Sequence, residues 1–191
     1  MTVGARRARW QFGRSATLGI SILGTSTASA AIARLLGDRP SGALMVGVWL
    51  IVLYSGILLA VVDIATRRLP TPLISVASLA TGAALLADAA ATRQAHTLTT
   101  ALLAAIALGG GHLILAVAGP STTGLGDVRM AALLGAALGA LGWSEVMWGA
   151  CLPYAVALPE ALARLLSRKP DLAFGPYLLA GALLAVVIVN F

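Results

Sequence analysis

Seven apolar stretches alternate with short polar or proline-containing breaks along the chain. They run over residues 16–36, 43–62, 73–90, 98–118, 128–143, 146–163 and 174–190. A helix that crosses a membrane needs roughly 20 predominantly apolar residues, and most of these stretches approach that length. The pattern therefore predicts an all-α fold, a polytopic membrane helix bundle of about six or seven transmembrane helices.

The first stretch allows two interpretations. Arginines precede it, and a run of small residues at 26–30 closes it, which is typical either of an uncleaved span or of a signal peptide. We favour an uncleaved span, and both interpretations bring the second stretch in from the outer side. We expect one transmembrane domain over 1–191, with a basic segment and a weak first span in 1–42 and the main bundle in 43–191.

The composition decides which solvent and partners to expect. Hydrophobic residues make up 59% of the chain, charged residues 10%, and the mean hydropathy is +0.94, so the expected solvent is the lipid bilayer rather than water. The net charge of +6 does not indicate nucleic acid, because the basic residues are scattered between apolar runs. The single cysteine, Cys151, excludes an internal disulfide, and we expect it to be a packing residue.

The basic residues predict the orientation of the bundle. With a cytoplasmic N-terminus, ten of the 13 lysines and arginines lie inside and three lie outside, which follows the positive-inside rule. The inner set is Arg6, Arg7, Arg9, Arg14, Arg67, Arg68, Arg129, Arg164, Arg168 and Lys169, and the outer set is Arg34, Arg39 and Arg93. The loops 63–72, 119–128 and 164–173 then share the cytoplasmic side.

Two of the seven acidic residues stand where an apolar stretch meets a cytoplasmic loop. Asp63 closes the second stretch, and Asp127 opens the fifth after Gly124-Leu125-Gly126. Two intervening spans return the chain to the same side, so we expect these carboxyl groups to meet. Two carboxyls at close range hold one proton between them, which lets one activate a water and the other protonate a leaving group. The pair predicts aspartic-protease chemistry.

Each aspartate also has a simpler interpretation. Asp after a glycine-rich turn often caps a helix N-terminus, which would account for Asp127. An acid at a helix C-terminus faces the negative end of the helix dipole, so capping does not account for Asp63, although an exposed interfacial position or a pair with Arg67 would.

Three sequence elements together resemble the prepilin peptidases of type IV pilus systems, over roughly residues 45–190. The first is Asp63 followed by Pro70, the second is Gly124-x-Gly126-Asp127-x-Arg129 at the start of a Gly/Ala/Leu helix, and the third is Phe174-Gly175-Pro176 before the last span. Their order, spacing and expected topology all agree with that family. The Gly-x-Gly-Asp element alone also occurs in presenilin-like and signal-peptide-peptidase-like proteases.

The resemblance implies a membrane aspartic endopeptidase in the bacterial cytoplasmic membrane, with its active site toward the cytoplasm. It implies that Asp63 and Asp127 are the catalytic pair, that the elements around them shape the site, and that the partner is a prepilin or pseudopilin precursor. No cofactor is implied, and His96 and His112 are too far apart to suggest a zinc site. From the helix dipoles we expect Asp127, at a helix N-terminus, to act as base and Asp63 to act as acid.

The chain departs from the family pattern in two respects. Thr71 and Arg129 stand where the family often has Asn and Lys. The cysteine-rich insert of the longer members, which also methylate the new N-terminus, is missing, which argues against a methyltransferase activity. The chain is similar to the short form associated with tight-adherence (Flp-type) pili.

Two other functions fit parts of this pattern. A small transporter or channel component would use intramembrane acids but predicts acids deep within spans, and a presenilin-class protease would want a Tyr-Asp pair and a Pro-Ala-Leu motif. His112 lies in the cytoplasmic half of its stretch, which would place it beside the site, although a lone helical histidine is more often a packing residue. Gly135 and Gly139 predict close helix packing, and plausible interface anchors are found among Trp10, Trp49, Trp143 and Trp148.

Overall fold

The protein is described here by a computed structural model that covers residues 25–37, 42–66, 70–118, 124–167 and 172–190. This part of the chain is helical apart from short connections and contains no strand. Residues 25–37 are helical, and the helices that follow are α2 (Gly42–Thr66), α3 (Thr71–Thr92), α4 (Ala95–Ala118), α5 (Leu125–Gly139), α6 (Trp143–Leu166) and α7 (Gly175–Asn190). The predicted helical bundle is confirmed.

Four helices of the described chain, α2, α3, α4 and α6, are long and apolar enough to cross a membrane. The other two differ from the expectation of full-length spans, because α5 has 15 residues and α7 has 16. The expected first span begins at residue 16, which lies outside the described residues. Large apolar side chains stand exposed on the long helices, among them Leu79 at 75% and Val117 at 81%, and such a surface fits lipid better than water.

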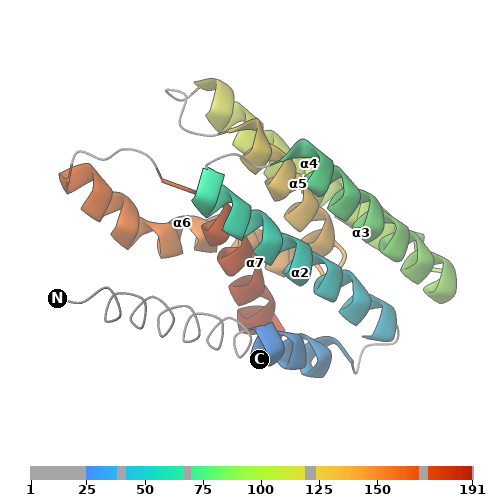
Figure 1. Cartoon of the computed structure of the whole chain (residues 1–191). Coiled ribbons are helices and arrows are strands. Elements are labelled where there is room, and N and C mark those ends of the chain that lie inside the picture. The colour runs from blue at the N-terminus through green and yellow to red at the C-terminus, as the bar shows by residue number, and fades with distance from the viewer. Residues whose placement is uncertain (1–24, 38–41, 67–69, 119–123, 168–171, 191) are drawn as a thin grey trace.

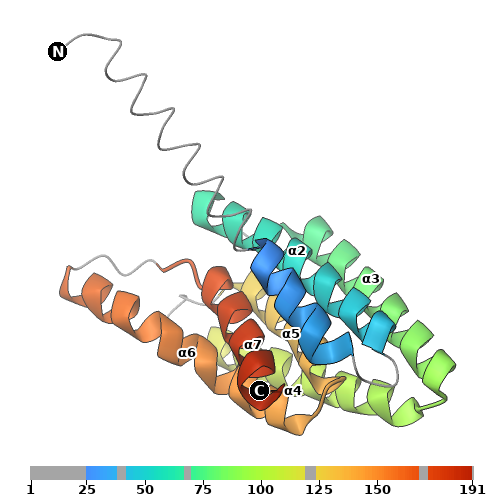
Figure 2. The same ribbon diagram turned by 90° about the horizontal axis from the view of Figure 1, so that it is seen from below.

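The two short helices lie at the centre of the bundle. Figures 1 and 2 show α5 and α7 beside α2, with α3 and α6 toward opposite sides, and α5 contacts each of the other labelled helices. In both views α6 diverges from the other helices toward its C-terminal end. Pro153 and Pro159 lie inside α6, where prolines remove helical hydrogen bonds and favour bending.

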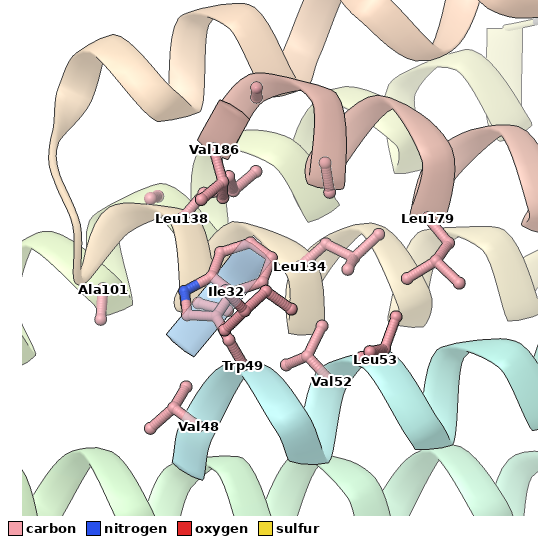
Figure 3. Packing of buried hydrophobic residues seen from close by; sticks show 14 of the residues in the cluster. Ile32, Val48, Trp49, Val52, Leu53, Ala101, Leu134, Leu138, Leu179 and Val186 are labelled. Atoms are coloured by element: carbon pink, nitrogen blue, oxygen red, sulfur yellow. The ribbon is translucent and has the colours of Figure 1, made fainter. Parts of the chain in front are cut away.

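Trp49 fills the middle of the apolar core. Its side chain is fully buried, and Figure 3 shows it among Ile32, Leu134, Leu138 and Val186. Trp49 is therefore no interface anchor, whereas Trp143 and Trp148 are about half exposed and Trp10 lies outside the described residues. Cys151 is exposed, so the expectation that it packs inside the bundle was wrong.

Small residues bring the backbones of α4 and α5 into contact. A Cβ added at Gly135 would stand 2.6 Å from the Ala104 carbonyl oxygen, and one added at Gly139 would stand 2.6 Å from that of Thr100. Real Cβ atoms do not approach backbone so closely. Between lipid-exposed helices the hydrophobic effect supplies little attraction, so close packing over small residues holds them together. The predicted close approach at Gly135 and Gly139 is confirmed.

We predict that Gly135→Ala and Gly139→Ala each lower the free energy of unfolding by about 1–3 kcal/mol, because the added methyl group pushes α4 and α5 apart. Gly110→Ala on α4 is the matched control, since a Cβ there meets nothing within 4 Å, and it should be neutral or stabilise slightly through helix propensity. Unfolding of the purified protein in detergent measures all three. Equal stability of the three variants would contradict the assigned packing.

Candidate active site

Helix ends from five elements gather at one end of the bundle. The end of α2 carries Asp63, the start of α5 carries Asp127, and the start of α7 begins at Gly175. The start of α3 and the last two turns of α4 join them through side-chain contacts described below. The structure thus brings together the three motifs that lie far apart in the sequence.

Asp63 is buried, with 6% of its surface exposed, in the last turn of α2. One oxygen, Oδ2, accepts a hydrogen bond from the backbone N–H of Gly175 at 3.1 Å. The other oxygen has no hydrogen-bond partner among the described residues. The interpretation of Asp63 as an exposed interfacial acid is therefore wrong, and a pair with Arg67 falls outside the described residues.

The Phe174-Gly175-Pro176 element leaves no N–H group of the first turn of α7 without an acceptor. The first N–H groups of a helix have no partner within the helix. Here the Gly175 N–H donates to Asp63, Pro176 has no N–H, and the N–H groups of Tyr177 and Leu178 donate to the Phe174 carbonyl. A residue larger than glycine at 175 would displace the Asp63 carboxyl, because an added Cβ would lie 2.9 Å from Asp63 Oδ2. The motif lets a helix start directly against a carboxylate.

Asp127 is buried, with 8% exposed, in the first turn of α5. Gly124 occupies the N-cap position in extended conformation, and its N–H donates to Asp127 Oδ2 at 3.2 Å. Asp127 is thus the third helical residue, not the N-cap itself, although its contact with the Gly124 N–H is half of a capping box. The capping interpretation accounts for Oδ2 of Asp127. The other oxygen has no hydrogen-bond partner among the described residues.

The two carboxyl groups are close enough for their charges to interact. Both are held in the same way, since each uses Oδ2 to accept one N–H from a glycine at the start of a helix. Hydrogen bonding therefore does not distinguish them as acid and base. What the arrangement offers chemically is a pair of fixed carboxyls, each with one oxygen that no described residue hydrogen-bonds, which can hold a water and a proton between them.

His112 borders this site, as its place in the cytoplasmic half of the fourth apolar stretch allowed. Its ring is buried, and Nδ1 lies 2.9 Å from the Leu108 carbonyl oxygen while Nε2 lies 3.3 Å from the Tyr154 hydroxyl. A carbonyl only accepts, so Nδ1 carries a proton, and in a neutral ring Nε2 accepts from Tyr154. His112 and Tyr154 both interact electrostatically with Asp127, so this pair borders the carboxyls.

Aromatic rings close the side of the site toward α6 and α7. The ring centroids of Tyr154 and Phe174 are 5.3 Å apart, and those of His112 and Phe174 are 6.3 Å apart. Offset and tilted contacts at these distances are favourable. Tyr154 lies 42 residues from His112 in the sequence, and no local pattern marks it, so sequence analysis did not find it.

The two positions that depart from the family pattern contact each other. Arg129 Nη1 donates to Thr71 Oγ1 at 2.6 Å, which links the start of α5 to the start of α3. Pro70 is the N-cap of α3, and its carbonyl accepts from the N–H groups of Leu73 and Ile74. Both Pro70 and Arg129 therefore position helix starts rather than the carboxyls themselves.

Comparisons with protein-family models, with curated proteins and with solved structures found no match. Among the described residues, no group of three or more histidine, cysteine, aspartate or glutamate side chains is placed to hold a metal ion. The function of this end of the bundle must therefore be argued from its own geometry.

We predict that Tyr154→Phe changes the imidazole of His112, because it removes the hydroxyl that donates to Nε2. The chain has two histidines, so ¹⁵N-histidine labelling resolves each ring, and the His112 Nε2 resonance should move toward that of a free imidazole nitrogen. Stability should fall by about 1 kcal/mol.

Tyr54→Phe is the control for that change, since the hydrogen bond of the Tyr54 hydroxyl in the described part of the chain is with Ser29 Oγ and not with His112. It should leave the His112 resonances in place. An unchanged Nε2 resonance in Tyr154→Phe would show that the two side chains are not hydrogen-bonded.

Proposed function

We propose that this protein is a membrane aspartic endopeptidase of the prepilin peptidase type, which removes the basic leader peptide from pilin-like precursors. One observation carries the proposal. Asp63 and Asp127, brought from α2 and α5 to one end of the bundle, are both buried, interact with each other and are fixed by backbone N–H groups. A structural role requires neither this pairing nor a free oxygen on each carboxyl.

Peptide hydrolysis needs a base and an acid in the same place. One aspartate takes a proton from a water, whose oxygen then forms a bond to the scissile carbonyl carbon. The other aspartate donates its proton to the carbonyl oxygen, which gives a tetrahedral intermediate. The first aspartate then passes the proton it took from water to the leaving nitrogen, the C–N bond breaks, and a hydroxyl of the intermediate returns a proton to the second aspartate. Our assignment of Asp127 as base and Asp63 as acid rests on the helix dipoles, since Asp127 lies in the first turn of α5 and Asp63 in the last turn of α2.

The position of the pair suits a substrate with a basic leader followed by an apolar helix. The carboxyls lie within the first or last turn of their helices, and on this proposal that end of the bundle meets the headgroup region. A leader in the cytosol and an apolar segment in the bilayer would hold the scissile bond at that level. Holding it beside the carboxyls lowers the barrier to cleavage without any further contact. On this proposal the site faces the cytoplasm of a bacterial cell.

The transporter alternative fits the structure less well. It predicts acids deep within spans and helices interrupted near the midplane, whereas Asp63 and Asp127 lie at helix ends, and the described helices α2–α7 run without interruption. Proton transport would also not require Asp63, at the end of α2, to be held by the start of α7.

We expect Asp63→Asn and Asp127→Asn each to abolish leader removal, because an amide neither takes up nor donates the proton. The protein is co-expressed with a small pilin-like precursor from the same genome, and mature product is scored by its mobility shift. Glu145→Gln, the same chemical change near the start of α6, is the control and should still cut. If either aspartate variant cuts at the wild-type rate while inserting normally, the dyad is wrong.

Gly175→Ala tests the geometry rather than the acids. The added methyl group displaces the Asp63 carboxyl, the flexible end of a side chain, so stability should hardly change. Cleavage should fall about 10- to 100-fold, because sub-ångström to ångström displacements of reacting groups cost that much. Gly82→Ala on α3, where an added Cβ meets nothing within 4 Å, should cut normally. Wild-type cleavage by Gly175→Ala would show that Asp63 is not held as described.

A further inference from the structure

A second polar region lies at the other end of the bundle. A cavity of about 450 Å³ opens where α3 ends, α4 begins, α5 ends and α6 begins. Helix α3 has 22 residues, so its two ends are about 30 Å apart. The cavity is therefore separate from the aspartate pair and plays no part in the chemistry proposed above.

Asp88 is the acidic residue that lines this cavity. Its side chain lines the cavity, is 98% buried because only 2% is exposed, and carries an oxygen, Oδ1, with no hydrogen-bond partner in the described chain. A buried carboxylate without a partner is costly. Trp49 Nε1 and Thr81 Oγ1 are also buried without partners, but neither residue lines the cavity.

Two threonine hydroxyls, one half-buried and one buried, are hydrogen-bond acceptors toward the cavity. Thr92 Oγ1 donates its proton to the Asp88 carbonyl at 2.8 Å, and Thr100 Oγ1 donates to the His96 carbonyl at 3.0 Å. A hydroxyl has a single proton, so both oxygens are left with lone pairs only. Both threonines line the cavity with Asp88. This part of the lining thus combines one carboxylate with acceptor oxygens.

A lining of this kind fits a compact cation that donates several hydrogen bonds. A primary ammonium group has one positive charge and three N–H donors. No lysine or arginine is among the residues that line the cavity. A hard divalent cation takes six to eight oxygens and usually several carboxylates, and the described residues hold no such cluster. The lining therefore favours an ammonium ligand over a metal ion.

The surroundings indicate where such a group comes from. The cavity lies at helix ends, and Trp143, which lines it, is 49% exposed. Tryptophan at a helix end typically marks the headgroup level of a bilayer. We propose that this cavity binds the primary ammonium of a phospholipid headgroup of the phosphatidylethanolamine type, with Asp88 as its counter-charge and Thr92 and Thr100 as acceptors.

The test compares headgroups on the purified full chain in detergent. Thermal unfolding is followed while dioctanoyl phosphatidylethanolamine, phosphatidylcholine or phosphatidylglycerol is titrated in, and free ethanolamine is titrated separately. We expect phosphatidylethanolamine to raise the midpoint saturably, by about 5 °C or more near hundredfold excess over its Kd. Phosphatidylcholine, whose ammonium has no N–H, and phosphatidylglycerol should give no saturable rise.

Variants assign the response to the cavity. Asp88→Asn keeps the shape and should lose the response, Thr100→Val should weaken it, and Glu160→Gln, which removes a carboxylate near the C-terminal end of α6, should keep it. Thr100→Val stands in for Asp88→Asn if that variant fails to fold. Protection by ethanolamine as well would still support the site and would identify a soluble amine as a ligand. Equal protection by phosphatidylcholine, or a full response in a folded Asp88→Asn or Thr100→Val protein, overturns it. Leader cleavage is not part of the readout, so the outcome is independent of the proposed protease activity.

Discussion

The N–H groups at the start of a helix need acceptors, and in a bundle that faces lipid there is little water to supply them. Helices α5 and α7 both begin at carboxylates. Gly124 donates to Asp127, and Gly175 donates to Asp63. The same two contacts satisfy orphan donors and fix the carboxyls, so folding of these helix starts and assembly of the candidate site are one event.

The two helices that begin at these contacts are shorter than the helix that carries Asp63. At 15 and 16 residues, α5 and α7 are about 23 Å long, whereas α2 with 25 residues is about 37 Å long. Helix α7 begins beside the last turn of α2, where Asp63 lies. The positive dipole ends of α5 and α7 therefore lie at the two buried carboxyl groups.

The apolar stretches were enough to predict the bundle and most of its helices, because a helix that spans a membrane must be a long run of mostly apolar residues. Asp63 and Asp127 could be singled out because acids are rare in such a chain and both stand at the ends of apolar runs. The roles of His112 and Tyr154 could not be found in this way. Their contact depends on how α4 and α6 cross, and helix crossings are fixed by packing rather than by local sequence.

Local sequence also gave wrong predictions of which side chains are buried, because burial depends on how the helices pack. Trp49 was a candidate interface anchor and is a core residue, while Cys151 was expected inside and is exposed. The bounds of α5 were expected at 128–143 and are Leu125–Gly139, because hydropathy ignores the helical turn that Gly124 and Asp127 create. Asp88 gave no signal at all, since an isolated acid near a helix end reads as a solvated residue until its surroundings are known.

The contact between α4 and α5 connects the two polar ends of the molecule. Gly139 and Thr100 approach closely at the cavity end, where both line the cavity, and Gly109 meets Ala132 nearer the other end, one turn before His112 and not far from Asp127. An interface of small residues has no long side chains to absorb a displacement, so a shift of one backbone must move the other. Larger side chains at these positions would separate the two backbones and weaken the packing that holds helices together in lipid. The close contact of α4 with α5 is therefore what sets the place of Asp127, on α5, relative to His112, on α4.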